Sequence, residues 1–199
     1  MLFPALLLLA LSSVLSSKEC PHHCLCYEHS DLVDCRARGF LQVPHGLSHG
    51  TWLLDLGGNL LMEVRSRAFR GLSRLRHLYL HANQLRAVRH GSLSMLPVLE
   101  ALQLGQNNIT HIDTEALAPL HSLTLLGLEG NQLQHLKFKT FLSLHTAGTH
   151  LQLAGNPWNC DCDLHRVFSK LLSVPWRSRT SATTTSYSCG FGDIEIEHR

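Results

Sequence analysis

The chain has 199 residues, of which 16% are charged, and its formal net charge is +2. A nucleic-acid partner calls for a concentrated basic surface, so this balance predicts that the protein does not bind nucleic acid. The 15 histidines are dispersed along the chain, and we expect no metal site and no other cofactor.

The N-terminal segment, MLFPALLLLALSSVLSS, forms an apolar run that ends in small residues. This pattern is typical of a secretory signal peptide over residues 1–17, cut near Ser16 or Ser17; the alternative is a buried N-terminal helix. No other stretch approaches the roughly 18 apolar residues that a membrane span requires. We therefore expect a secreted, extracellular product with no membrane span in this chain.

Four cysteines follow in residues 18–50 with the spacing C-x3-C-x-C-x8-C: Cys20, Cys24, Cys26 and Cys35. Disulfides form in an exported protein, whereas four close cysteines in a cytosolic one suggest zinc. Disulfides are therefore favoured, although the spacing alone allows three connectivities.

Residues 51–155 repeat one short pattern at a constant interval. The interval is set by the repeated asparagines, which are Asn59, Asn83, Asn107 and Asn131. Leucines occupy the fourth and sixth positions of each unit and alternate with other residues, which predicts a short strand with one buried face. The units begin at Thr51, Leu75, Leu99 and Leu123, and a fifth, imperfect unit begins near Gly148, one position later than the constant interval would place it.

Apolar residues at positions 11, 14, 19 and 22 of each unit return the chain to the same interior, so each unit is one turn of a coil. One turn cannot enclose a core by itself, and stacked turns build a continuous core with a parallel sheet. The amide of the repeated asparagine both donates and accepts hydrogen bonds. It is therefore expected to satisfy backbone groups where each strand ends.

The segments LRHLYLHANQLRAV and LEALQLGQNNITHI fit LxxLxLxxNxLxxL, and over roughly residues 20–175 the chain resembles the extracellular leucine-rich repeat family. The resemblance implies an α/β solenoid: a right-handed coil of about five repeats with a concave parallel β-sheet and an irregular convex side. It also implies that residues 18–50 form a cysteine-rich N-terminal cap in which Cys20 pairs with Cys26, and Cys24 with Cys35.

The segment NPWNCDCDLHRVF is similar to the start of the family's C-terminal cap, which we place at residues 156–189, followed by a tail at 190–199. The resemblance implies that Cys160 pairs with Cys189, while Cys162 lacks a fourth cap cysteine as partner. The odd cysteine has three explanations: an intermolecular disulfide, a free thiol, or a chain that ends early. We favour the last, which makes the C-terminal cap incomplete.

The side chains between the core leucines point out of the predicted sheet, where the family's partners usually dock. We predict that binding depends on Trp52, Asp55, Arg76, His77, Tyr79, His81, Gln103 and Glu129, with Trp52, Arg76, Tyr79 and His81 as the anchor cluster. The alternative is an ordinary solvated strand face. Arginines 65, 67, 70, 74 and 76 also lie close in sequence; a solvated face is favoured there over binding of a sulfated polysaccharide.

The sequence Asn108-Ile109-Thr110 is a glycosylation sequon, and we expect Asn108 to carry a glycan rather than remain an unmodified amide. No catalytic motif is found, so we do not expect an enzyme.

The predicted function is therefore the binding of an extracellular or cell-surface protein, or of a matrix component, on the concave face. The resemblance implies roles in adhesion, matrix organisation, receptor recognition or channel regulation. Two alternatives remain open: a shortened form of a single-pass membrane receptor or channel-regulating auxiliary subunit, and a secreted hydrolase.

Overall fold

The structure is a computed structural model that describes residues 20–27, 29–142, 144, 149–159, 177–178 and 195–197. Several predicted features lie outside these residues: the signal peptide at 1–17, Gly148, Cys160, Cys162, Cys189 and most of the predicted C-terminal cap and tail.

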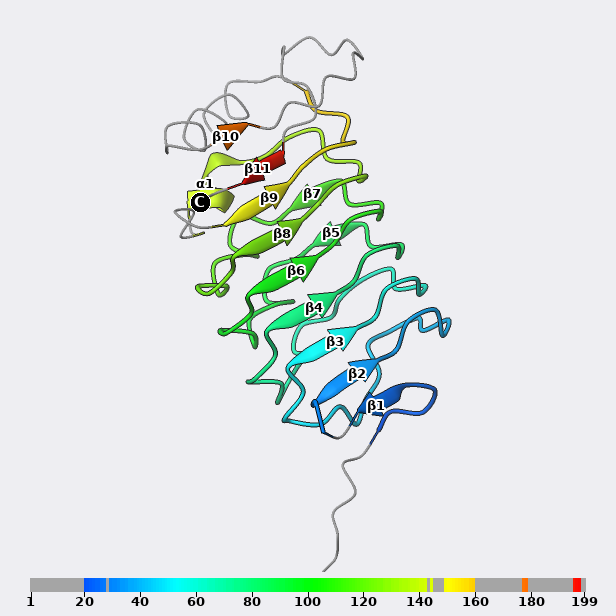
Figure 1. Cartoon of the computed structure of the whole chain (residues 1–199). Helices are drawn as coiled ribbons and strands as arrows, with labels where there is room; N and C mark the ends of the chain where they lie inside the picture. Colours follow the sequence, from blue (N-terminus) through cyan, green and yellow to red (C-terminus); the bar gives the residue numbers. More distant parts are fainter. Residues whose placement is uncertain are drawn as a thin grey trace, which may run out of the picture.

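The described part of the chain is a β-solenoid of about five turns, with one strand of the main sheet in each turn (Figure 1). Adjacent strands pair in parallel and in register, so that Leu54 lies beside Leu78, and Leu78 beside Leu102. The constant interval between repeats produces this register. The parallel strands of the described part are β2 (Leu32–Asp34), β3 (Leu53–Asp55), β4 (His77–Tyr79), β6 (Ala101–Gln103), β8 (Leu125–Gly127) and β9 (His150–Gln152).

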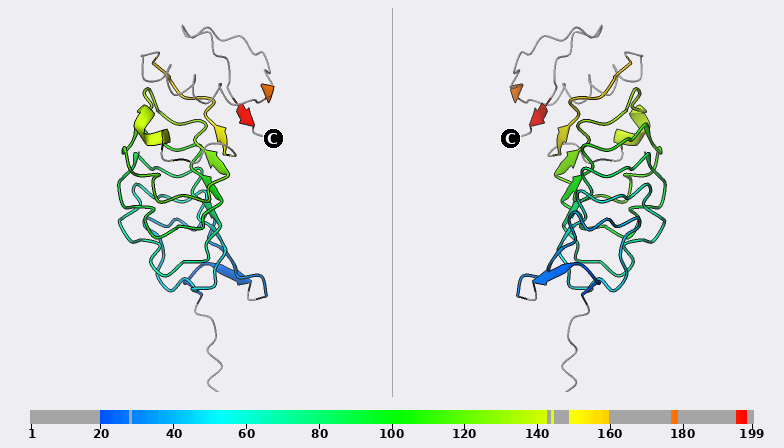
Figure 2. Two further views of the ribbon diagram at one scale, coloured as in Figure 1. Left: turned by 90° about the vertical axis from the view of Figure 1, so that its left-hand side faces the viewer. Right: turned by 90° about the vertical axis from the view of Figure 1, so that its right-hand side faces the viewer.

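Antiparallel strands cover both ends of this parallel array. At the N-terminal end β1 (Leu25–Tyr27) pairs with β2, and at the other end β11 (Glu195–Glu197) pairs with β9 and with β10 (Arg177–Ser178). Figure 2 shows the strands of the main sheet along one side of the coil. Within the described residues the sheet therefore has nine strands, larger than the five repeats predict. The added strands pair with backbone groups that a bare parallel edge would leave open.

The side of the coil away from the main sheet consists mostly of turns. It contains a second small sheet of β5 (Ala87–Val88) and β7 (His111–Ile112), which pair in parallel, and the short helix α1 (Phe138–Leu142). The helix lies in the fourth turn, where the interval between the paired leucines Leu126 and Leu151 is one position longer than in the turns before it.

The interior of the coil is filled by the repeated leucines. Leucines at the fourth position of each turn are fully buried, with exposures of 0%: Leu54, Leu78, Leu102, Leu126 and Leu151. The other repeated apolar positions join them in one continuous cluster, and Trp158 packs against its C-terminal end. The cluster extends into the N-terminal segment through Val33 and Cys35, so the first repeat is also covered.

Two disulfides hold this N-terminal segment together. The structure joins Cys20 to Cys26 and Cys24 to Cys35, the pairs that the family resemblance implies. Cys35 is also a core residue with 0% exposure, so its bridge ties the segment directly to the first turn of the coil.

A ladder of buried asparagines connects each turn to the one before it. The Asn83 amide nitrogen donates to the carbonyl oxygens of Leu56 (2.9 Å) and Leu80 (3.1 Å), and its Oδ1 accepts from the Leu61 amide (3.0 Å). Leu56 and Leu61 belong to the preceding turn. Equivalent bonds link adjacent turns through Asn59, Asn107, Asn131 and Asn156.

Replacing one asparagine of the ladder tests how much the stack depends on it. An Asn83→Leu variant leaves buried donors and acceptors of two turns without partners, each at a cost of about 1–3 kcal/mol. We expect its free energy of unfolding to fall by about 3 kcal/mol or more in denaturant titrations. The exposed Asn108 provides the control, since Asn108→Leu should change the same quantity by less than about 0.5 kcal/mol. Equal losses in the two variants would contradict a structural role for the buried amide.

Candidate binding face

The candidate binding face is the outer surface of the main sheet, where side chains alternate with the core leucines. Because the strands pair in register, these side chains form two straight columns across the strands. The first column consists of Leu32, Leu53, His77, Ala101, Leu125 and His150. The second column consists of Asp34, Asp55, Tyr79, Gln103, Gly127 and Gln152.

Aromatic rings gather in the N-terminal half of this face. The Trp52 ring meets the His77 ring edge to face at a centroid distance of 5.1 Å, and Tyr79 approaches His81 in the same way at 6.4 Å. All four side chains are half-buried, and the Trp52 indole nitrogen donates to the Ser30 carbonyl oxygen. The rings therefore hold one another in place while each still presents surface to a partner.

Charged side chains surround the rings and are paired with one another. Arg36 contacts Asp34 at 2.7 Å and Asp55 at 3.5 Å, while Arg76 contacts Glu100 at 2.7 Å. The hydrogen bond from Arg36 lowers the pKa of Asp34. Burial raises the pKa of Asp55, although its Oδ1 accepts a hydrogen bond of 2.9 Å from the Gly57 amide.

Glycines in the binding face allow longer side chains to lie flat on the sheet. A Cβ atom added at Gly127 would stand 1.7 Å from Gln103 Oε1, and one at Gly105 would stand 2.0 Å from Glu129 Oε1. Gln103 also bonds across the sheet to Gln152 at 3.3 Å. The C-terminal half of the face is therefore low and polar, in contrast to the aromatic N-terminal half.

Two polar atoms of the face are buried without a hydrogen-bond partner among the described residues. They are Nδ1 of His77 and Oε2 of Glu129. A buried polar atom without a partner is costly, so these two groups lower the stability of the face.

The match to a known family coincides with these turns. Residues 73–133, which include β4 to β8, match the family described as "Leucine rich repeat". This chain carries leucine-rich repeats. The buried leucines and the asparagine ladder give the physical reason for the match.

Two related proteins match this chain over longer segments. Chondroadherin-like protein of Homo sapiens is 38% identical over 87 residues, which cover 44% of this chain and 11% of the relative. Leucine-rich repeat-containing protein 3 of Danio rerio is 28% identical over 192 residues, which cover 96% of this chain and 60% of the relative. The chain thus spans less than two thirds of either relative.

A solved structure shares the fold of these repeats. The structure of the Toll–Spatzle complex of Drosophila aligns with a TM-score of 0.50 and 22% identity, over 56% of this chain and 16% of that chain. This likeness concerns the fold alone.

The structure brings most of the predicted binding residues of this leucine-rich repeat chain together. Trp52, Asp55, Arg76, His77, Tyr79 and His81 lie on or beside β3 and β4, and Gln103 lies on the next strand. Glu129 lies in the C-terminal half of the face, after β8.

Sequence reasoning missed Asp34 and Arg36, because the N-terminal segment was assigned only to a cap. A signal was available in the sequence. Val33 and Cys35 alternate like Leu54 and Leu56, and the structure pairs Val33 with Leu54. A valine and a cysteine thus replace the two leucines of a strand, which extends the face by one strand.

Other parts of the described chain add no metal-binding geometry. Within the described ranges, no group of three or more His, Cys, Asp or Glu side chains is placed to hold a metal ion. Over the same residues, no helix has the length and apolar character needed to cross a bilayer. Asn108, the predicted glycosylation residue, is exposed beside the buried Ile109.

The two aspartates of the binding face should respond to pH in opposite directions. The lowered pKa of Asp34 means that its ionised form stabilises the fold above its unfolded pKa, and that this contribution is lost as pH falls through the folded pKa. The raised pKa of Asp55 means that stability decreases as pH rises from its unfolded pKa, about 3.9, through its folded value.

We therefore expect Asp34→Asn to lower, and Asp55→Asn to raise, the free energy of unfolding at pH 7. Both differences from the unmodified protein should be smaller near pH 3, which lies below the unfolded pKa of aspartate, about 3.9. The asparagine at 55 still accepts from the Gly57 amide, so this variant removes mainly the buried charge. Denaturant titrations at the two pH values measure the effect, and stability changes of the same sign at pH 7 would contradict it.

Proposed function

We propose that this leucine-rich repeat chain is a secreted module that docks an extracellular or cell-surface protein, or a matrix component, on the binding face. The supporting observation is the cluster of Trp52, His77, Tyr79 and His81 beside Arg76. Tryptophan, tyrosine and arginine are the residue types that contribute most at protein interfaces. Here they stand on a rigid sheet, so little conformational freedom is lost when a partner binds.

The size of the face fits a protein rather than a small molecule. Six parallel strands spaced about 4.8 Å apart separate the outermost strands by about 24 Å. A standard interface requires about 800 Å² from each partner, so a protein docked on these three-residue strands also contacts the turns beside them. The low C-terminal half leaves room for the edge of a protein, whereas a shallow sheet of this kind does not enclose a small ligand.

The chemistry of the face indicates what the partner supplies at its contact points. The Arg36 and Arg76 guanidiniums are already engaged with carboxylates, so they leave little free charge on the face. A partner that places hydrogen-bonding groups over Gln103 and Gln152 and apolar atoms over the Tyr79 ring matches both halves of the face.

The proposal includes the extracellular setting and the organisation of the chain. Two disulfides support export, since such bonds persist in oxidising compartments. The proposed organisation is a signal peptide at 1–17, an N-terminal cap at 18–50, repeats at 51–155, a partial C-terminal cap at 156–189 and a tail at 190–199. We also propose that the protein binds its partner without catalysing a reaction, and that Asn108 carries an N-glycan.

Capture of partner proteins by matched variants, run side by side, tests whether the binding face is the docking surface. The mature protein, an Arg76→Ala/Tyr79→Ala variant and a Met95→Ala/Lys137→Ala control are immobilised and exposed to secreted and cell-surface proteins. Met95 and Lys137 are exposed residues outside the sheet, so the control removes one apolar and one basic side chain elsewhere.

We expect a partner that is retained by the unmodified protein and by the control but not by the Arg76 and Tyr79 variant. In titrations with that partner, the loss of two anchor residues should raise Kd about tenfold or more. If every captured protein binds the double variant as well as the control, the binding face is not the docking surface.

The glycan on Asn108 has a separate test. After expression in secretory cells, enzymatic removal of N-linked glycans should lower the apparent mass of the protein, and Asn108→Gln should abolish this shift. Asn108-Ile109-Thr110 is the only such sequon in the sequence, so an unmodified protein that shows no shift would exclude the modification.

A further inference from the structure

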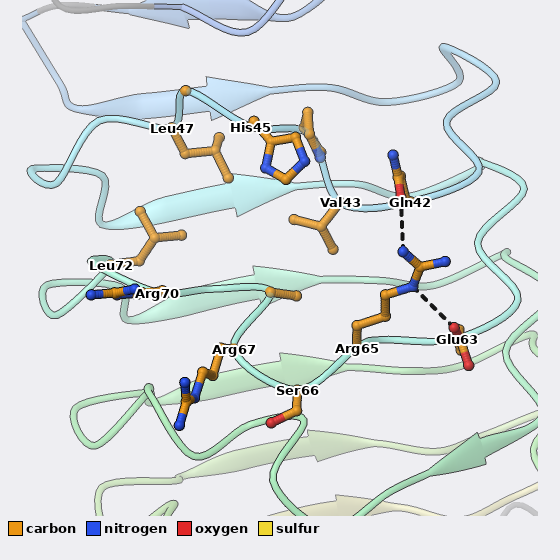
Figure 3. A pocket seen from close by; sticks show the side chains of 13 residues that line it. Gln42, Val43, His45, Leu47, Glu63, Arg65, Ser66, Arg67, Arg70 and Leu72 are labelled. Atoms are coloured by element: carbon orange, nitrogen blue, oxygen red, sulfur yellow. Dashed lines mark hydrogen bonds and ion pairs between the residues drawn. The ribbon is translucent and has the colours of Figure 1, made fainter.

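A basic hollow lies outside the binding face, between the N-terminal segment and the first repeat. It has a volume of about 380 Å³ and is lined by residues 42–47 and by residues between 63 and 72 (Figure 3). Its charged lining consists of Arg65, Arg67 and Arg70 against the single carboxylate of Glu63. We call it the arginine hollow. None of its lining residues belongs to the binding face, so the two surfaces are separate.

Most of this positive charge is not neutralised by the protein itself. Arg65 contacts Glu63 at 3.2 Å, in an exposed pair, and also approaches Gln42 at 3.5 Å. Arg67 and Arg70 are exposed, and neither forms an ion pair with any described residue. Figure 3 shows Arg67 and Arg70 apart from the contacts that Arg65 makes with Gln42 and Glu63. The arrangement differs from the binding face, where the arginines are paired.

The backbone at Arg67 adds an independent observation. Residues 65–68 form a turn closed by the bond from the Ala68 amide to the Arg65 carbonyl at 3.1 Å, and Arg67 has a φ of 64° within it. This left-handed conformation favours glycine and costs other residues about 1–2 kcal/mol.

The next turn of the coil has glycine at this position. The equivalent turn of residues 89–92 is closed by the Ser92 amide and the Arg89 carbonyl at 3.2 Å, and its left-handed residue is Gly91, with a φ of 80°. The first repeat thus has an arginine where the same backbone in the second repeat has glycine. A strained residue with an unpaired guanidinium in the lining of a hollow is a candidate functional position.

The positive surface continues along the coil for one more turn. A neighbouring hollow of about 680 Å³ shares Arg65 and adds Arg86 and Arg89. Arg89 occupies the same position in the second turn as Arg65 in the first, so the two side chains extend from adjacent turns into the lining of one hollow. In the third turn this position is Asp113, which limits the positive surface to two turns.

We propose that the arginine hollow and its continuation bind a sulfated polysaccharide chain. The guanidinium group presents paired N–H donors that match the oxygens of a sulfate group, and its charge does not titrate at physiological pH. A single polysaccharide strand enters a hollow whose charges stand on its walls, whereas a flat bilayer surface does not. Repeated sulfate groups on one chain match charges that recur from one turn to the next.

A heparin oligosaccharide titrated into the full mature protein tests this assignment. We expect binding to the sulfated oligosaccharide, and no binding to the same oligosaccharide after chemical desulfation. Because binding releases counterions, the affinity should fall steeply between about 50 and 200 mM salt. Vesicles containing phosphatidylserine, with no polysaccharide, serve as the probe for an anionic lipid surface.

Three variants locate the site. Arg67→Gly should weaken binding about threefold to fivefold without lowering the melting temperature, because glycine relieves the strained backbone. Adding Arg65→Gln and Arg70→Gln should extend the loss to about tenfold or more and reduce the salt dependence by about one unit of log–log slope per arginine. Lys137→Gln removes one exposed charge at the same position two turns beyond Arg89, and should leave binding unchanged.

Each other outcome overturns the proposal. Absence of oligosaccharide binding, equal binding after desulfation, or an equal loss in the Lys137 variant would exclude a sulfate site in the hollow. Binding to vesicles but not to the oligosaccharide would assign the arginines to a lipid surface instead. Because Arg67→Gly retains the turn that Gly91 forms in the next repeat, a folded variant is available for the measurement. The outcome of the oligosaccharide titration does not depend on whether a protein is captured on the binding face.

Discussion

The structure depends on one buried amide in each turn. Where a strand of the main sheet ends, the backbone bends and its polar groups turn toward an interior otherwise filled with leucine. Each ladder asparagine donates to carbonyl oxygens of its own turn and of the turn before, and accepts from an amide of that earlier turn. An apolar residue of similar size fills the space but leaves these groups without partners. The asparagine therefore fixes both the bend and the distance to the next turn.

Because the distance between turns is constant, the residue types on the outer surface of the sheet can vary without changing the core. Positions four and six of each repeat are occupied by leucine, with little variation, whereas the positions between them vary freely. The first column shows this freedom, since Leu53, His77 and Ala101 are neighbours on a sheet whose inner face hardly changes. Glycine at 105 and 127 then lets Glu129 and Gln103 lie across the sheet. The proposed binding residues thus occupy positions that the core leaves free to vary.

The two proposed sites use charge in different ways. On the binding face, Arg36 and Arg76 are held by carboxylates, so the surface presents oriented aromatic rings and hydrogen-bonding groups rather than a net field. In the arginine hollow, Arg67 and Arg70 have no such partners within the described chain. Affinity for a protein depends on shape and on oriented side chains, whereas affinity for a polyanion depends on positive charge that no carboxylate neutralises. One short coil therefore offers two chemically distinct surfaces, which can be occupied together because they share no residues.

The sequence by itself determined the repeat, the buried leucines, the strands and the asparagine ladder, and it indicated most of the aromatic cluster. These features follow from a fixed period, because residues one period apart occupy equivalent places in a stack. The tertiary structure alone decided the features that have no period. It placed Val33 and Cys35 in the first strand of the parallel sheet, joined Arg36 to two aspartates on different strands, and laid β11 against β9. It also closed the arginine hollow between residues 42–47 and the first repeat. Such contacts arise between segments whose side-chain directions and spacing are set only when the turns pack, and no local pattern along the chain records them.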